Sequence, residues 1–310
     1  MNIAVICRSF TYTDGCPAND FAPNLSHKCF NTEKFILNDQ GILPVDYSPH
    51  STAICSILFG YDSNAVFPGI GEFNYSGITP EAHAEIFEFW HFLIDYLYSF
   101  EEIESEIITA AMGTPYQDWW TRGLESLARN QGKIIIASIG NGTRANDPLL
   151  YPAAGSNIIG VGVINSVNSS EAIYSLDNFS LAQPETSSTG PSEDGRCKPD
   201  LVAPGNCLAA DYRSTDGYRI TGSWSSFAAP TTAGAAALLL QEIKHSSRLD
   251  TDSKPLNCLI KALLMNSAQK LPYWHKGRLT PEDDHTVPLD YIQGAGLLNC
   301  ERAHKLLTAG

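Results

Sequence analysis

The sequence predicts an α/β fold of three layers, in which helices cover both faces of a mostly parallel central sheet. Short apolar runs alternate along the chain with stretches that have helical spacing, which is the order of elements in parallel sheets. Strands of a parallel sheet are buried on both faces, so their sequences are continuously apolar rather than alternating. Five runs fit this description: Ile3–Ile6, Ile107–Ala111, Lys133–Ile139, Ile158–Ile164 and Leu201–Ala203.

The segments between these runs predict helices and one hairpin. The run Thr-Pro-Glu at 79–81 supplies an N-cap, a proline at the first helical position and an early acid, so we expect a helix from there to about Leu97. The dipeptide Asp-Gly at 216–217 favours a tight turn between two short strands. The other expected elements are helices over Gln117–Asn130, Asn257–Ser267 and Cys300–Leu307, a polar loop through Thr280–His285, and hairpin strands over Leu208–Tyr212 and Tyr218–Thr221.

Composition describes a globular chain that can bury one large core. Of its 310 residues, 43% are hydrophobic and 17% are charged, and we find no repeat, low-complexity tract or linker. We therefore expect a single domain over residues 1–310. The formal net charge of −14 argues against nucleic acid or an anionic membrane as a partner, because both select basic surfaces. No apolar run reaches the length needed to span a membrane.

The cysteines and the N-terminal residues bear on the compartment. Eight cysteines occur without a Cys-x-x-Cys pair, so zinc and redox motifs are absent. In a chain of this length we expect them to be small buried residues rather than a disulfide framework. The run Met1–Arg8 lacks a basic start, and its apolar part is too short for a secretory signal. These observations favour an intracellular setting, and no prosegment is recognised.

Residues 221–240 put a serine at the start of a small, apolar helix. Ser226 follows a short β-like run and precedes a predicted helix over Ala228–Leu240, with Pro230 in the first turn, where a missing N–H costs nothing. The free backbone N–H groups of a helix N-terminus stabilise a developing oxyanion. Taken alone, Ser226 would be an N-cap, which is the common role of a serine at this position.

Two blocks of sequence extend this observation to a known family. Residues 225–230, Ser-Ser-Phe-Ala-Ala-Pro, resemble the nucleophile motif Gly-Thr-Ser-x-Ala-x-Pro of the subtilisin-like serine peptidases. The segment Ser187–Gly205 is similar to the long family segment that precedes that serine. The resemblance is strong from about 105 to 300 and fair around 47–60. It implies a subtilisin-like fold, hydrolysis of peptide bonds through an acyl-enzyme, and a peptide or protein as substrate.

The resemblance also implies roles for individual residues. Ser226 would attack the scissile carbonyl, and His50, in an order similar to the family's His-Gly-Thr motif, would be the general base. Asn141, after a buried strand, would hold the oxyanion together with the backbone N–H of Ser226. The substrate would pair by strand addition with two backbone segments. These segments consist of Ala111, Met112 and Gly113, and of Ser138, Ile139 and Gly140.

The acidic member of the catalytic triad is not at the position that the family uses. The family has an aspartate directly after its first buried strand, where this chain has Cys7, and a thiol cannot neutralise an imidazolium. Asp20 keeps the family's spacing of seven residues to a Ser-His pair ending at His27, although residues 14–19 before it are not strand-like. Asp14 begins a turn but its spacing fits nothing. We favour Cys7 at the aspartate position, with Asp20 as the rival third catalytic residue.

Two functions therefore stay open. The first is an active serine endopeptidase; the second is a catalytically impaired pseudo-protease that binds peptides in the retained groove. Cys7, the missing prosegment and Trp224, which replaces a family glycine and would be strained at a positive φ, motivate the second. Peptide ligation or cyclisation is a third reading that nothing in the sequence favours over hydrolysis. We expect no cofactor and no metal, since no loop has a calcium-ligand spacing, although members of the family often bind calcium.

Overall fold

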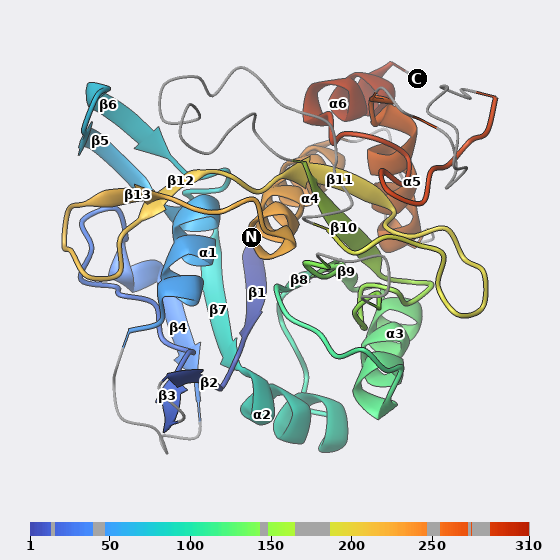
Figure 1. Ribbon diagram of the computed structural model, residues 1–310, viewed down its shortest axis with the longest axis horizontal. Helices are drawn as coiled ribbons and strands as arrows, with labels where there is room; N and C mark the ends of the chain where they lie inside the picture. Colours follow the sequence, from blue (N-terminus) through green and yellow to red (C-terminus); the bar gives the residue numbers. More distant parts are fainter. Residues whose placement is uncertain are drawn as a thin grey trace.

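Seven strands of the described residues form one parallel sheet at the centre of the computed structural model (Figure 1). The structure describes residues 1–13, 16–39, 47–142, 148–164, 187–246, 255–271, 274 and 286–309. The strand order is β11-β10-β9-β8-β1-β7-β4, and each neighbouring pair is parallel. The strands are β1 (Asn2–Cys7), β4 (Phe35–Asn38), β7 (His83–Glu88), β8 (Ile107–Ala110), β9 (Ile134–Ser138), β10 (Ile159–Ile164) and β11 (Leu201–Pro204). All five strands that the apolar runs predict are confirmed.

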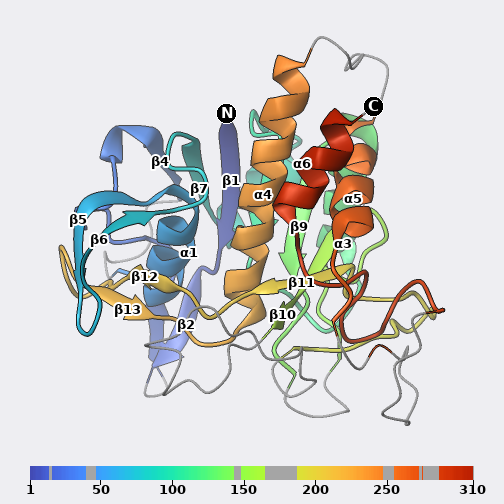
Figure 2. The same ribbon diagram turned by 90° about the horizontal axis from the view of Figure 1, so that it is seen from above.

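Helices cover both faces of this sheet, which confirms the predicted three-layer α/β arrangement (Figure 2). One face carries α1 and α4, with α5 and α6 packed beyond them, and the other carries α2, a π-helix and α3. The residues of β1 alternate between the two cores: Ile3, Val5 and Cys7 belong to the first, and Ala4 and Ile6 to the second. The helices are α1 (Pro49–Phe59), α2 (Phe89–His91), the π-helix (Phe92–Tyr98), α3 (Trp119–Gln131), α4 (Ser225–His245), α5 (Leu256–Ser267) and α6 (Cys300–Thr308), with a 3₁₀ turn at Thr32–Lys34.

The largest error of the sequence prediction lies at 79–97, where a single helix was expected. Residues 83–88 instead form β7, which pairs with β1 on one side and β4 on the other. The hydroxyl of Thr79 donates to the Leu58 carbonyl oxygen at 3.1 Å instead of capping a helix. Helical structure starts only at Phe89, where the side chain of Glu88 accepts from the His91 backbone N–H at 2.7 Å. Burial between two neighbouring strands has overridden the local helix-start signal.

The start of α4 also differs from the prediction. The helix begins at Ser225, three residues before the expected start, and Trp224 precedes it with an extended backbone at φ −117°. Trp224 is therefore not strained, because the large side chain has no positive φ to accommodate. Pro230 lies in the second turn rather than the first, so the Ser226 carbonyl lacks its helical donor. None of the described helices is long and apolar enough to cross a membrane.

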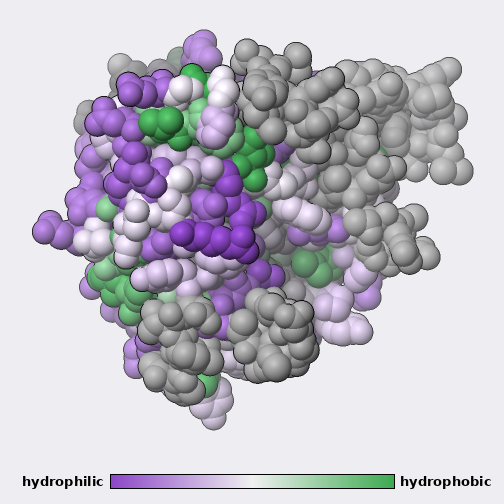
Figure 3. Space-filling model, turned by 60° about the vertical axis from the view of Figure 1, so that its left-hand side comes forward, coloured by the Kyte–Doolittle hydropathy of each residue, from purple (hydrophilic) through white to green (hydrophobic). Residues whose placement is uncertain are grey.

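In the part of the chain that the structure describes, three antiparallel hairpins lie outside the sheet. The hairpin predicted around 216–217 is confirmed. Residues 16–19, which the sequence did not mark as a strand, pair antiparallel with Phe10–Thr13, and they do so without an apolar run. The face that carries β5, β6, β12 and β13 is mostly hydrophilic, with small separate apolar groups (Figure 3). The hairpins are β2 (Phe10–Thr13) with β3 (Cys16–Asn19), β5 (Tyr61–Phe67) with β6 (Gly71–Ser76), and β12 (Leu208–Ala210) with β13 (Tyr218–Ile220). The polar loop expected through 280–285 lies outside the described residues.

The unexpected strand β7 leads to a stability prediction. Ile86 is fully buried in β7, so Ile86→Ala should lower the free energy of unfolding by about 2–5 kcal/mol through lost burial and the cavity left behind. The control is Ile36→Ala on β4, where the side chain is 56% exposed, and it should cost less than about 1 kcal/mol. Urea unfolding measures both, and equal losses would argue that 83–88 is not a core strand.

Candidate active site

One cavity brings together three of the residues that the sequence predicts to be functional. It has a volume of about 290 Å³ and lies where the carboxyl ends of the central strands meet the N-termini of α1 and α4. Crevices outside the carboxyl ends of parallel strands are the usual sites of α/β folds. Ser226, His50 and Asn141 all line it. The full lining consists of Arg8, Pro49, His50, Asn141, Arg219, Gly222, Trp224, Ser226 and Phe227.

Ser226 is the second residue of α4, which puts its hydroxyl at the positive end of that helix. Its backbone N–H lies in the first turn and has no intrahelical acceptor, so it is available to an oxyanion. The hydroxyl donates to the carbonyl oxygen of Ala111 at 3.2 Å. Within the described residues no hydrogen bond joins Ser226 to His50. The serine is therefore in the cavity but is turned away from its predicted base.

Asn141 is held in one orientation by Ser225, the neighbour of the candidate nucleophile. The Asn141 Oδ1 accepts from the Ser225 backbone N–H at 2.7 Å and from the Ser225 hydroxyl at 2.8 Å. A flipped amide would put a donor against the N–H donor, so this orientation is chemically determined. Its other end, the NH₂ group, is left as a donor. The preceding Gly140 has φ +116°, and a β-carbon there would lie 2.5 Å from the Ser188 Oγ, so only glycine fits.

His50 lies in the first turn of α1, two residues after the N-cap Ser48. Its Nδ1 is buried and has no hydrogen-bond partner, and its ring centre lies 5.9 Å from that of Phe227. Burial, and after it the nearby positive charge of Arg8, lower the pKa of His50 to about 3. The ring is therefore neutral at neutral pH. Nδ1 is the atom that the aspartate of a serine-protease triad orients, and here that atom has no carboxylate.

Cys7, which the sequence analysis expects at the aspartate position of the family, is the last residue of β1. Its side chain is buried and hydrogen-bonds to Ser51, the residue after His50. Burial raises the pKa of the Cys7 thiol to about 12, so the thiol is uncharged at neutral pH. The cysteines whose side chains are described form no disulfide. The end of β1 thus supplies no negative charge to the imidazole.

Asp20, the rival third catalytic residue, bonds to the N-cap of α1, and among the described residues no hydrogen bond or ion pair joins it to His50. It is 1% exposed, and its Oδ1 accepts from the Ser48 hydroxyl at 2.5 Å. Its Oδ2 forms an ion pair with the Nη2 of Arg8, also at 2.5 Å. Burial raises the pKa of Asp20, whereas Ser48 and Arg8 act in the opposite direction. Both oxygens of the carboxylate are therefore already bound, one by Ser48 and the other by Arg8.

His27, the remaining histidine candidate, does not line the cavity. His27, seven residues after Asp20, is buried and its Nε2 hydrogen-bonds to the Gly217 carbonyl oxygen at 2.8 Å. That ring packs against Tyr218 with centres 5.1 Å apart, so its surroundings are structural. Asp14 lies outside the described residues.

The two segments expected to pair with a peptide differ in how their backbone is used. Ile139 donates its N–H to Val161 and its carbonyl accepts from Leu150, at 3.0 and 2.9 Å. Gly140 donates to the Ser225 hydroxyl at 3.3 Å, and its carbonyl accepts from Ser188 at 3.0 Å. Ser138, before them, is the last residue of β9. A peptide that pairs with the backbone at 139–140 would have to replace these hydrogen bonds with its own.

The partner segment, Ala111, Met112 and Gly113, follows the end of β8. Ala111 already faces the candidate nucleophile through its carbonyl oxygen. A β-carbon at Gly113 would lie 2.6 Å from the Tyr151 carbonyl oxygen, so the backbone passes close to the loop at 150–152. A larger residue at this position would push that loop away from the segment.

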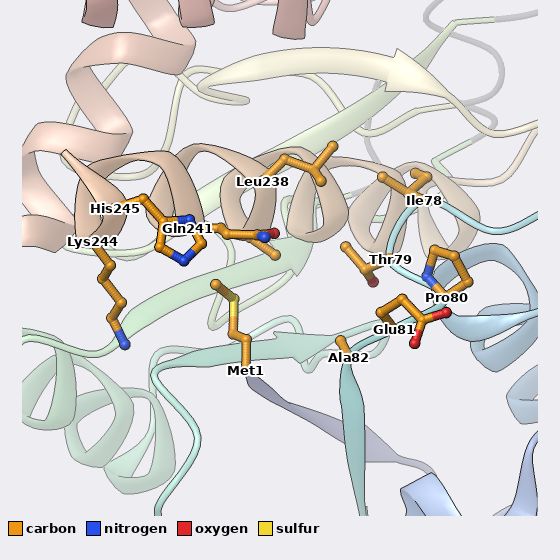
Figure 4. Close-up of a pocket in the computed structure, with 11 residues that line it drawn as sticks. Met1, Ile78, Thr79, Pro80, Glu81, Ala82, Leu238, Gln241, Lys244 and His245 are labelled. Carbon is orange, nitrogen blue, oxygen red and sulfur yellow. The ribbon is translucent and has the colours of Figure 1, made fainter.

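A larger cavity, of about 450 Å³, lies at the other end of α4 and lacks this chemistry (Figure 4). Its lining includes apolar groups from Met1, Ile78 and Leu238. Two charged groups at its edge are engaged in salt bridges: Lys244 with Glu106, and Glu81 with Lys34. His245 lines it, but no serine or cysteine does among the described residues. We therefore assign the candidate site to the smaller cavity.

No metal site is evident in the part of the chain that the structure describes. There, no group of three or more histidine, cysteine or acidic side chains is arranged to hold a metal ion.

Comparisons with known proteins identify the family. The model of the subtilase family matches residues 92–296, more than half of the chain, so the protein belongs to the subtilase family. The major intracellular serine protease of Bacillus subtilis (strain 168) is 26% identical over 239 residues, covering 73% of this chain and 65% of that protein. The serine protease AprX of the same organism is 28% identical over 200 residues, covering 60% and 38%. The subtilisin-like protease SBT6.1 of Arabidopsis thaliana is 29% identical over 175 residues, covering 56% and 14%.

This chain thus spans between 14% and 65% of the length of these relatives. Solved structures resemble the whole of it. The prenylagaramide maturation protease PagA is 21% identical with a TM-score of 0.64, covering 99% of this chain and 94% of that one. The PatG macrocyclase in complex with peptide is 16% identical with a TM-score of 0.65, covering 99% and 91%. At these identities the similarity establishes the fold alone.

The surroundings of His50 predict how its ring titrates. Its imidazole should stay neutral well below pH 6.5, and Arg8→Gln should raise its pKa, because a nearby positive charge that opposes protonation is removed. NMR of the labelled imidazole ring measures both. A His50 midpoint near pH 6.5 in the folded wild type would contradict the geometry.

A stability measurement provides an independent control for this titration. His50 protonates near pH 6.5 in the unfolded chain but only near pH 3 in the folded protein. Its contribution to the free energy of unfolding is therefore complete above pH 6.5 and is lost as the pH falls toward 3. His50→Gln should remove this part of the acid destabilisation.

Proposed function

We propose that this chain is a serine peptidase in which Ser226 is the nucleophile and His50 is the general base. Asn141 and the backbone N–H of Ser226 would form the oxyanion hole. The observation that carries the proposal is the lining of a single cavity by all three residues in a member of the subtilase family. The substrate would be a peptide or protein, and no nucleic acid or membrane takes part.

The reaction follows from the positions of these groups. The Ser226 hydroxyl turns from the Ala111 carbonyl to the His50 imidazole, which takes its proton as the oxygen bonds to the scissile carbonyl carbon. The carbonyl oxygen becomes an oxyanion that accepts from the Asn141 amide and the Ser226 N–H. His50 then gives the proton to the leaving amine as the C–N bond breaks. Water repeats the sequence, with His50 as base, and releases the acid product.

Turnover in this proposal is slow, because none of the described side chains stabilises the imidazolium that the reaction requires. The Nδ1 of His50 has no partner, and Arg8 opposes its protonation. Replacing the triad aspartate in a serine protease lowers kcat about 10⁴-fold. Asp20 would act as the counter-ion of Arg8 and as a partner of Ser48, and would serve His50 only by exchanging these contacts.

A peptide-binding protein without useful turnover is the second candidate. The surroundings of His50 favour it, because a neutral, buried imidazole whose protonation is opposed by the charge of Arg8 is a poor base. Binding would need only the groove and the backbone segments near Ala111, and neither requires a proton transfer.

Labelling with a fluorophosphonate serine-hydrolase probe separates the two candidates. The folded wild type should be labelled at Ser226, and Ser226→Ala should not be labelled. His50→Ala should slow labelling about 100-fold or more, because the general base is lost. Ser223→Ala, a serine in the same loop that does not line the cavity, is the matched control and should label normally. Folded wild type that fails to label would support the peptide-binding candidate.

The missing acid leads to a gain-of-function prediction. Cys7→Asp should speed labelling at least about tenfold, toward the roughly 10⁴-fold that a triad aspartate contributes, because a carboxylate would stand at the family position. Labelling rates at neutral pH measure the gain.

Cys7→Ser is the matched control for this experiment, since it keeps a small neutral group that can bond to Ser51. Its labelling rate should equal that of the wild type. A folded Cys7→Asp protein no faster than Cys7→Ser would mean that something other than the absent acid limits the reaction.

A further inference from the structure

The cavity at Ser226 is positively charged, although the chain as a whole is strongly acidic. Two arginines, Arg8 and Arg219, are among its lining residues, and no carboxylate is, within the part of the chain that the structure describes. The formal net charge of the chain is −14. Elsewhere on this protein an acidic ligand is repelled on average, so a local cationic cavity is a selective feature.

Of the two arginines, Arg219 has fewer charged and hydrogen-bonding partners. It lies on β13, where its Cα is paired with that of Ala209, and its side chain is exposed. In the described residues its guanidinium has no ion pair and no hydrogen bond. Arg8 is 41% exposed and shares its charge with Asp20, yet it still acts as a positive charge on His50. The cavity thus has one unpaired guanidinium and one that is only partly neutralised.

The position of the cavity indicates which part of a substrate would meet these charges. Its lining includes none of the residues of the two expected peptide-pairing segments, at 111–113 and 138–140. It extends from Ser226 toward the β12–β13 hairpin, which packs beside α1, while β8 and β9 lie across α4 (Figure 1). If the acyl part of the substrate lies along the two segments, the cavity receives the part that leaves with the amine.

We propose that this cavity binds a carboxylate on the leaving-group side of the peptide, with Arg219 as the main specificity-determining residue and Arg8 as its neighbour. The carboxylate is either an acidic side chain after the scissile bond or the free C-terminus of a short leaving peptide. The inference rests on the proposed function, because it takes Ser226 as the point of cleavage.

The chemistry of the cavity suits such a ligand. A guanidinium presents a planar fork of N–H donors that matches a carboxylate in a bidentate pair. Trp224 is 46% exposed at the cavity and lies against Gly222, where an added β-carbon would come 2.1 Å from the indole Nε1. The indole therefore forms a flat apolar wall beside the arginines, against which the hydrocarbon part of an acidic residue can pack.

The test uses binding rather than turnover, so that it is independent of the proposed reaction. Ser226→Ala protein is titrated with three short peptides that carry a free amino end, as a leaving group does: Ala-Asp-Ala amide, Ala-Asn-Ala amide and Ala-Asn-Ala with a free carboxylate. The indole N–H signal of Trp224, followed by NMR, reports binding at the cavity. We expect the Asp peptide or the free-carboxylate peptide to bind about tenfold tighter than the neutral amide. The tighter of the two identifies the source of the carboxylate.

Substitutions in the same background show whether the arginine carries the preference. Arg219→Gln should remove most of it, and Arg219→Glu should reverse it. Arg213→Gln is the matched control: Arg213 lies in the turn between β12 and β13, stacks on Tyr212 at 5.0 Å and does not line the cavity. High salt should weaken the preference, since the charges are partly exposed.

The outcomes separate this inference from the proposed function. Equal affinities for the three peptides, or a preference unaffected by Arg219→Gln, would overturn the inference even if Ser226 labels normally. A carboxylate preference that depends on Arg219, in a protein that does not label, would leave the carboxylate site in place and reject the peptidase.

Discussion

The close packing of α4 against the sheet determines the geometry of the cavity. The buried face of this helix is built from small residues, including Ala228, Ala229, Ala233 and Ala236, which let its axis approach β8, β9, β10 and β11. Its N-terminus then lies where the Ala111 carbonyl meets Ser226. Larger side chains on this face would lift the helix away, because a close-packed core has no space to receive them.

A second constraint is electrostatic and acts at the start of α1. Asp20 is buried there between Ser48 and Arg8, so the helix N-terminus and an arginine share one carboxylate. The same arginine lines the cavity together with His50 and lowers the pKa of that histidine. The imidazole is thus influenced by a cation that opposes its protonation, and Cys7 at the end of β1 supplies no negative charge to balance it. This arrangement weakens the base and, together with Arg219, makes the cavity attractive to anions, so one feature bears on both reactivity and specificity.

The sequence predicted five of the seven described strands of the central sheet, and it placed the helices α3, α5 and α6 to within two residues at each end. Continuous apolar runs such as Ile134–Ser138 have one stable environment, the interior of a parallel sheet, and all of them were found there. The segment 83–88 carried helix-start signals just before it, and these are local and weak against burial between β1 and β4. Residues 16–19 became a strand through pairing with Phe10–Thr13, which no property of the short segment itself announces. The arginines of the cavity were missed because an isolated arginine carries no motif.

By itself the sequence determined the α/β class and the positions along the chain of five central strands. It also determined the three candidate residues Ser226, His50 and Asn141. Each of these is encoded locally, by an apolar run or by a short motif at a strand or helix end. Only the tertiary structure decided what surrounds His50: a thiol bonded to Ser51, a carboxylate committed to Ser48 and Arg8, and a free Nδ1. These groups come from segments whose separation is set by packing, and the protonation of a histidine depends on distances that no single segment contains.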